Sequence, residues 1–354
     1  MINPALPGVA AQPVTTPRLT TRVLFAGATG GVPVLCLHGN TSSATWWEDV
    51  LTTLPAGFRG IAPDQRGFGD ADPDQPIDAT RGLGDLADDA VALLDQLGLA
   101  DAHVVGHSLG GNVVWRLLQD HAGRVRSATL VDPGSPYGFG GTRDNAGTPC
   151  APDFAGSGGG LSHPELIRRM AANDLSLESP FSPRAVLRSL IVRPPFVSPR
   201  EDALVLAMNA SHVGPRDLPG DKTLSPHWPF VAPGEWGPTN ALSPKYAGDV
   251  GKLAGLTRKP PILWIRGAHD LIVSDNAASD PAVLGSRGLV PGWPGADVYP
   301  PQPMVSQIRA VLEQYTQAAG DVREVVVADA GHAPHLERLD DFNAALHKHL
   351  HRIG

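Results

Sequence analysis

The feature that most constrains this chain is a glycine-flanked serine, Ser108, in the segment Gly-His-Ser-Leu-Gly at positions 106–110. A short apolar run, His103–Val105, precedes it directly, and residues 109–119 follow with apolar side chains at helical spacing. Glycines on both sides of the serine let a strand and a helix approach closely, because a β-carbon there would clash. The segment therefore predicts a strained strand-to-helix turn that holds the Ser108 hydroxyl above the end of a strand.

The rest of the chain supplies further strands for the same sheet. Short apolar runs rich in Val, Ile and Leu occur at Arg22–Ala26, Val34–Leu37, Gly60–Ala62, His103–Val105, Ala128–Val131, Ile262–Ile265 and Glu324–Val327. They alternate with helical patterns such as 86–97 and 109–119. Unalternated apolar runs suit strands buried on both faces, and strands that alternate with helices indicate a mostly parallel sheet.

Two irregular stretches interrupt this alternation. Glycine and proline contribute 40 and 35 of the 354 residues, but a hydrophobic content of 42% argues against disorder. The block at 134–255 is rich in loops and aromatic residues and poor in charge, which favours an inserted cap over a flexible spacer. A second insertion, 274–320, separates the last two predicted strands. We therefore predict a core of residues 1–133 and 256–354 and a cap or lid domain of residues 134–255.

Composition excludes several classes of partner. The net charge is −8 and no Lys/Arg cluster suited to phosphates is present, so nucleic-acid binding is not expected. No apolar run reaches the roughly 18 residues that a membrane span needs. The first residues lack the basic start and apolar core of a secretory signal, and two cysteines, Cys36 and Cys150, give no disulfide framework. The chain is therefore predicted to be cytoplasmic.

Serine is a weak nucleophile and needs a base that is itself oriented by an acid. In a parallel sheet, both groups should follow later strands. His332 comes directly after the last predicted strand, and His335 is the runner-up. Asp270 follows the preceding strand and is the preferred acid, while Asp132, at the end of an earlier strand, is its rival. The sequence thus predicts the catalytic set Ser108, Asp270 and His332.

Two backbone amides are predicted to stabilise the negative oxygen that forms when a serine attacks a carbonyl. The N–H of Leu109 follows the serine at a helix N-terminus, and the N–H of Asn40 lies in the turn after the second predicted strand. Aromatic residues of the two irregular stretches are possible walls of a substrate pocket: Trp228, Trp236 and Trp293.

Taken together, these motifs resemble the α/β-hydrolase superfamily, in its capped esterase-like group. The resemblance spans positions 22–346 and rests on His38–Asn40, Asp64–Gly69, Gly106–Gly111, Gly267–Asp270 and Gly331–His332. It implies an α/β-hydrolase fold, with a mostly parallel eight-stranded sheet flanked by helices and a cap inserted after the sixth strand. It also implies that Ser108 is the nucleophile, His332 the base and Asp270 the acid, and that Asn40 and Leu109 supply the amides.

The expected function is hydrolysis of a carboxylic ester or lactone of a bulky, largely uncharged small molecule, through an acyl-enzyme on Ser108. An amidase or peptidase, a carbon–carbon bond hydrolase and a perhydrolase share these residues and remain alternatives, as does a non-catalytic ligand receptor. No cofactor is implied. No metal is implied either, because no His, Cys or carboxylate pair stands at zinc spacing. We expect a small-molecule ester or lactone as the partner and a monomer or homodimer as the assembly.

Overall fold

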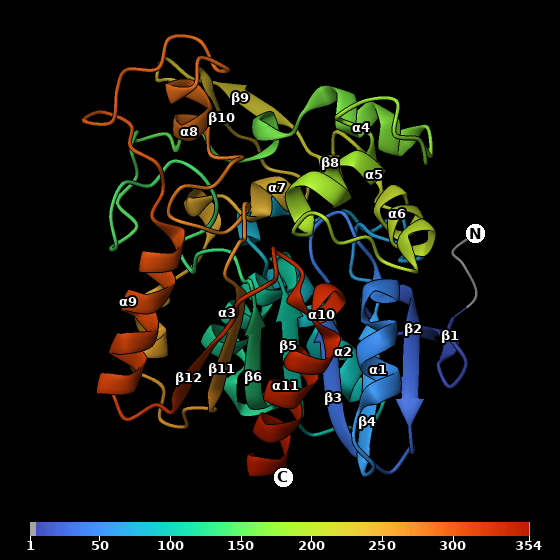
Figure 1. The fold of residues 1–354 in the computed structure, drawn as a ribbon. Helices are drawn as coiled ribbons and strands as arrows, with labels where there is room; N and C mark the ends of the chain where they lie inside the picture. The colour runs from blue at the N-terminus through green and yellow to red at the C-terminus, as the bar shows by residue number, and fades with distance from the viewer. Residues whose placement is uncertain (1–4, 354) are drawn as a thin grey trace.

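The computed structural model describes residues 5–353, and an eight-stranded sheet forms its centre (Figure 1). The strands lie in the order β1 (Ala10–Thr15), β2 (Thr20–Gly27), β4 (Phe58–Pro63), β3 (Val32–Leu37), β5 (Ala102–His107), β6 (Val125–Val131), β11 (Ile262–Gly267) and β12 (Val322–Val327). The pairs β1–β2 and β2–β4 are antiparallel, and all other neighbours are parallel. The predicted mostly parallel sheet of eight strands is confirmed.

One strand, β1, has no counterpart among the predicted apolar runs. Its side chains are exposed except for one that is half-buried, and it contains Pro13. Proline is tolerated on an edge strand, because the missing N–H faces no neighbour there. A strand of this composition carries no apolar pattern from which it could be predicted.

Helices cover both faces of the sheet, because successive side chains of a strand point to opposite faces. The longer helices of the core are α1 (Glu48–Thr53), α2 (Gly84–Gln96), α3 (Leu109–Asp120), α9 (Met304–Gln317) and α11 (Leu339–Ile353). Leu35 of β3 packs in one apolar cluster with residues of α2, α3 and α9. Its neighbour Val34 packs in another cluster with α1 and α11. Burial on both faces explains the continuous apolar sequence of β3.

After β6 the chain leaves the sheet and returns to it at β11. We refer to residues 132–261 between these strands as the insertion. Its elements are short: α4 (Pro164–Ala171), α5 (Pro183–Val186), a π-helical turn (Leu187–Ile191), α6 (Glu201–Asn209), β7 (Val213–Gly214), β8 (Leu218–Pro219), β9 (Lys222–Leu224), β10 (Val231–Pro233) and α7 (Pro238–Ala241). Figure 1 shows most of them above the end of the sheet at which the parallel strands finish. Its last part packs on the core, since Leu253 joins the same cluster as α3. A separate cap domain stays a prediction.

The second irregular stretch joins the insertion to form a shared cover. Before α9 of the core begins, it contains α8 (Pro281–Ser286) and a long loop. Trp228 of the insertion packs against Ala282 and Tyr299, and the Tyr299 hydroxyl donates to the Ala155 carbonyl oxygen at 3.0 Å. Both stretches that interrupt the strand–helix alternation therefore lie together over one region of the sheet.

The remaining helical elements are small. They are α10 (Pro334–Glu337) and 3₁₀ turns at Ala44–Trp47, Ala79–Arg81, Ala122–Arg124, Gly159–Leu161, Pro244–Tyr246 and Val250–Leu253. Across residues 5–353, every helix falls short of the length and apolar character that crossing a bilayer demands.

Candidate active site

Ser108 lies at the turn between β5 and α3. Its backbone has φ 52° and ψ −119°, a conformation with positive φ that residues other than glycine rarely adopt. Its N–H donates to the Val131 carbonyl oxygen at 2.9 Å. A β-carbon on Gly106 would overlap the Gly110 carbonyl, and one on Gly110 would overlap the Leu37 carbonyl of β3, so α3 approaches both strands closely because these positions are glycine. Strain of this kind persists where the surrounding structure holds it, typically at functional sites.

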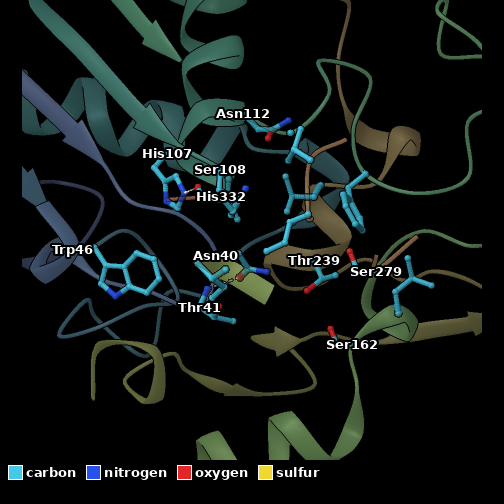
Figure 2. A pocket seen from close by; sticks show the side chains of 18 residues that line it. Asn40, Thr41, Trp46, His107, Ser108, Asn112, Ser162, Thr239, Ser279 and His332 are labelled. Carbon is cyan, nitrogen blue, oxygen red and sulfur yellow. Dashed lines mark hydrogen bonds between the residues drawn. The ribbon is translucent and has the colours of Figure 1, made fainter. Parts of the chain in front are cut away.

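His332 and Asp270 are hydrogen-bonded to each other, although 62 positions separate them in the chain. The Nδ1 atom of His332 lies 2.8 Å from Oδ2 of Asp270. The other carboxylate oxygen of Asp270 accepts from the N–H groups of Ile272 and Val273, at 2.7 and 2.9 Å. Because the carboxylate accepts, Nδ1 of His332 donates and Nε2 is left as the basic nitrogen. Ser108 and His332 both line one cavity, and Figure 2 shows their side chains next to each other.

Asp132, the rival acid, lies beside this pair but does not hold the imidazole. Both of its carboxylate oxygens accept from the Gly267 N–H, at 3.0 and 3.3 Å. Burial, reinforced by the charge of Asp270, raises the pKa of Asp132 well above its usual value. Two buried carboxyl groups this close cannot both ionise. Asp270 is thus the carboxyl group bonded to His332, and Asp132 accepts from the Gly267 N–H instead.

Asp132, Asp270 and His332 also form a group of potential metal ligands, with one ligand atom from each within 4.8 Å of the others. Their closeness has another explanation, because a hydrogen bond already joins His332 to Asp270. A metal ion bound by His332 Nδ1 would have to replace that bond. We therefore assign these three side chains to proton transfer rather than to metal binding.

His335, the runner-up base, is a packing residue. Its ring stacks on Trp47 and lies against His107, with ring centroids 4.6 Å apart in both cases. The side chain is fully buried and does not line the cavity with Ser108. Burial lowers the pKa of His335 to about 3, so the ring is neutral at physiological pH.

His107, the residue before Ser108, links the strand-to-helix turn to the predicted base, His332, by a hydrogen bond. Its Nε2 lies 2.7 Å from the His332 carbonyl oxygen and therefore donates to it. Burial and neighbouring histidines lower the pKa of His107 well below its usual value, so this donor is a neutral imidazole. The backbone of His332 is thus held from the same turn that presents Ser108.

The loop that carries the base is also bonded to the insertion. The His332 N–H donates to the Ile191 carbonyl oxygen at 2.8 Å. The Glu337 carboxylate accepts from the N–H groups of Gly331, at 2.9 Å, and of Arg193, at 2.6 Å. The position of His332 therefore depends on residues 191–193 as well as on the sheet.

The two predicted amide donors, Asn40 and Leu109, both line the cavity beside Ser108. Leu109 is the first residue of α3, where the backbone N–H has no acceptor within the helix. The loop before Asn40 is fixed by Gln65, whose side chain donates to the His38 carbonyl oxygen at 2.7 Å and whose N–H donates to His38 Nε2 at 3.0 Å. The oxyanion role of these amides stays a prediction.

The cavity beside Ser108 has a volume of about 220 Å³ (Figure 2). The core contributes Asn40, Thr41, Trp46, Ser108, Asn112, Ile272, Val273 and His332 to its walls. The insertion contributes Phe139, Leu161, Ser162, Ile191, Thr239 and Leu242, and the second irregular stretch contributes Ser279. The residues that line this cavity include no Lys, Arg, Asp or Glu. The cavity therefore suits an uncharged, partly apolar molecule.

The three tryptophans expected as pocket walls lie elsewhere, and that prediction is wrong for this cavity. Trp228 and Trp293 belong to a separate apolar cluster with Tyr299. Trp236 stacks under the guanidinium of Arg216, with 4.1 Å between the charge centre and the ring centroid. These rings are used for packing within the cover, which is the common role of a large aromatic side chain.

Trp46 is the tryptophan that does line the cavity. Its ring stacks on His107 at 6.0 Å, and its Nε1 donates to the Leu204 carbonyl oxygen at 3.2 Å. Asn112 was also missed, although it stands one helical turn after Ser108, a spacing that places both on one helix face. No comparable sequence signal marks Thr239 or Ser279, because tertiary packing alone brings them to the site.

A family model described as the alpha/beta hydrolase fold matches residues 32–290. The chain belongs to the alpha/beta hydrolase family. Its sequence is 39% identical over 111 residues to the AB hydrolase superfamily protein YfhM of Bacillus subtilis (strain 168), a match that covers 31% of this chain and 38% of that protein. It is 35% identical over 122 residues to a non-heme chloroperoxidase of Kitasatospora aureofaciens, covering 34% of this chain and 43% of that protein.

The matches to these two curated relatives thus span about two fifths of each relative's length. Among solved structures, the chain is similar to the carboxylesterase CesB of Bacillus subtilis, with a TM-score of 0.58, 18% identity, and coverage of 97% of this chain and 91% of that one. A likeness at that identity concerns the fold. The reaction has to be argued from the site.

Proposed function

We propose that the protein is a serine hydrolase that cleaves a carboxylic ester or lactone through an acyl-enzyme on Ser108. One observation carries the proposal: Ser108 stands on a strained turn in the same cavity as His332, whose Nδ1 is bonded to Asp270 at 2.8 Å. A nucleophile, a base and a group that orients the base are the parts that acyl transfer requires.

In the proposed reaction, the Ser108 oxygen attacks the substrate carbonyl carbon while His332 Nε2 takes the hydroxyl proton. The amides of Leu109 and Asn40 donate to the oxyanion of the tetrahedral intermediate. His332 then returns the proton to the leaving alcohol as the carbon–oxygen bond breaks, which leaves an acyl-enzyme. Water attacks the acyl carbon with His332 again as base, and Ser108 and a carboxylic acid are released. Asp270 stabilises the imidazolium that forms in both halves.

The polarity and volume of the cavity restrict the range of substrates expected from the sequence. The residues of its walls include no Lys, Arg, Asp or Glu, which supports an uncharged substrate. Its volume of about 220 Å³ is below the roughly 300–1,000 Å³ typical of sites for drug-sized ligands. We therefore propose that the enclosed part of the substrate is small, rather than bulky, with any larger part extending outside.

The decisive test compares Ser108→Ala with the wild-type protein. We expect kcat/KM on a short 4-nitrophenyl ester to fall by roughly 10⁴–10⁶-fold in the variant, because nucleophile and base act as one unit. A fluorophosphonate probe should label the wild-type protein once and leave Ser108→Ala unlabelled. Ser189→Ala serves as the matched control, because this exposed hydroxyl bonds only to the Ala185 carbonyl oxygen, away from the cavity.

Activity of Ser108→Ala near the wild-type level would falsify the mechanism. A wild-type protein that binds esters without turning them over or taking the label would instead be a ligand receptor. Turnover across 4-nitrophenyl esters, lactones and anilides then separates an esterase or lactonase from an amidase.

A further inference from the structure

We infer that the far wall of the Ser108 cavity is a subsite for a neutral oxygen function of the substrate, a ketone or hydroxyl group a few atoms from the scissile carbonyl. The inference deepens the proposed function and rests on it. It stands on two hydroxyl groups of that wall, those of Thr239 and Ser279, and on Asn112 nearer to Ser108, and the three residues come from separate parts of the chain.

Each of these groups has a buried polar atom without a protein partner. The hydroxyl oxygens of Thr239 and Ser279 and the Oδ1 atom of Asn112 are buried and make no hydrogen bond to any residue in 5–353. Most buried polar side-chain atoms in folded proteins have a partner. Three side chains that line one cavity thus carry an unpaired polar atom, with which a molecule in the cavity can form a hydrogen bond.

Among the other polar side chains at the site, His107 also has an unpaired buried atom, Nδ1, whereas the amide oxygen of Asn40 is paired. Oδ1 of Asn40 accepts from the Thr41 N–H at 3.0 Å. The amide nitrogen of Asn112 donates to the Ser135 carbonyl oxygen at 2.9 Å, which fixes the orientation of that side chain and leaves Oδ1 as the open acceptor. Apart from the ring nitrogen of His107 next to Ser108, the unpaired atoms are thus one amide oxygen and two hydroxyls.

The chemistry of these atoms selects the ligand. A hydroxyl group donates to a ketone or ether oxygen, and an amide oxygen accepts from a substrate hydroxyl. A substrate that displaces water from such a wall loses affinity unless it replaces the hydrogen bonds of that water. A substrate carboxylate or ammonium is disfavoured at this wall, because the lining residues include no Lys, Arg, Asp or Glu to pair with it.

The arrangement in space also fits a subsite. Thr239 lies in α7 of the insertion, Ser279 lies in the loop before α8, and Asn112 lies on the first turn of α3. Figure 2 shows Thr239 and Ser279 on one side of the cavity and Ser108 with His332 on another. A substrate with its carbonyl at Ser108 can therefore extend its polar group toward the two hydroxyls.

The test uses pairs of esters in which a ketone oxygen replaces a methyl group of the same size. On the acyl side, the 4-nitrophenyl esters of 4-oxopentanoate, 5-oxohexanoate and 6-oxoheptanoate are compared with those of 4-methylpentanoate, 5-methylhexanoate and 6-methylheptanoate. On the alcohol side, 3-oxobutyl acetate is compared with 3-methylbutyl acetate. The readout is the ratio of kcat/KM within each pair, after subtraction of the uncatalysed rate.

We expect the wild-type protein to favour the ketone about three- to tenfold in at least one pair, the effect of one neutral hydrogen bond. In Thr239→Val or Ser279→Ala, that ratio should fall to one or below. Thr239→Ser keeps the hydroxyl and should keep the preference. Ser286→Ala is the control, because its hydroxyl bonds to the Val283 carbonyl oxygen on α8, and it should leave the ratio unchanged.

Ratios at or below one in every wild-type pair would overturn the subsite. A preference that survives in both Thr239→Val and Ser279→Ala would equally overturn its assignment to these hydroxyls. Either result leaves the proposed function intact if Ser108-dependent turnover persists. Loss of turnover on all esters, with no fluorophosphonate label, would instead overturn the proposed function itself. Thermal unfolding of each variant separates loss of the subsite from loss of the fold.

Discussion

The sheet core and the insertion are stabilised in different ways. In the core, two extensive apolar clusters cover the two faces of the sheet. The insertion has smaller apolar clusters, one of which contains Leu187, Leu204 and Met208, and in addition a buried polar side chain, Asn240, that bonds to several of its loops. Its amide oxygen accepts from Gly159 and Gly234, and its amide nitrogen donates to the Trp236 and Asp221 carbonyl oxygens. Apolar clusters tolerate many sequences, whereas one polar centre fixes several loops at once.

This difference has a functional counterpart. The residues proposed for bond cleavage lie in turns next to core strands, where a few local residues define the backbone. The residues that shape the far wall of the cavity lie in the insertion and in the loop before α8. The core is therefore expected to set the reaction, and the cover is expected to set which molecules reach it.

After the loss of Ser108 itself, the largest expected effect comes from the acid of the core. Asp270→Asn should lower kcat/KM by roughly 10³–10⁴-fold, because the amide can hold His332 in the wrong tautomer and cannot stabilise an imidazolium. Asp132→Asn should stay within about tenfold of wild type, because Asp132 accepts from the Gly267 N–H, which an amide oxygen can also do, whereas His332 is bonded to Asp270. The comparison is made by measuring kcat/KM of both variants at neutral pH.

A loss in Asp132→Asn as large as in Asp270→Asn would show that the charge rests on the other carboxyl. The two substitutions are matched in size and chemistry and lie within the same group of three side chains. Urea unfolding of both variants is the control for stability.

The next effect concerns the insertion. Asn240→Ala leaves the buried N–H groups of Gly159 and Gly234 without their acceptor, which should cost about 2–4 kcal/mol of local stability. Hydrogen exchange should speed up at residues 156–161 and 232–241 while β5 and β6 keep their protection. The matched control is Asn209→Ala, a half-buried asparagine of α6 that bonds to Asn173 and Asp174.

Equal loss of protection in the core and in the insertion would remove the distinction between them. A drop in activity is also expected, since Thr239 of the cavity wall precedes Asn240 directly in α7. That drop should fall mainly on the ketone preference if the cover sets substrate choice.

The same contrast explains what could be predicted from the sequence. The positions of Ser108, Asp270 and His332 could be inferred because parallel strands end at one edge of the sheet, so loops that follow different strands meet. The helix expected at 109–119 is α3, at 109–120, since its apolar spacing is regular. Strand β1 gave no apolar signal because it lies exposed at the edge.

The cavity walls could not be predicted in this way. Trp228 and Trp236 were reasonable pocket residues by type, but their rings pack against other parts of the cover. Thr239 and Ser279 reach the cavity only through contacts between distant loops, such as the bond from Gly140 N–H to the Gln302 side chain at 2.6 Å. Periodicity reports on regular elements and carries no information about how irregular segments meet.

The smallest expected effect is a pH dependence located in the core. His103 lies in β5, and burial lowers its pKa to about 4, so the folded protein holds it neutral. In the unfolded chain its pKa is about 6.5. Between these values the unfolded state binds more protons, so the free energy of unfolding falls as the pH drops from 6.5 toward 4. One histidine contributes at most about 1.4 kcal/mol per pH unit to that slope.

His103→Asn should reduce the slope by up to this amount in urea unfolding between pH 7 and 5. Ser127→Ala, which removes the hydroxyl 2.7 Å from His103 Nδ1 but keeps the imidazole, should retain it. An unchanged slope in His103→Asn would mean that this core position does not titrate on unfolding.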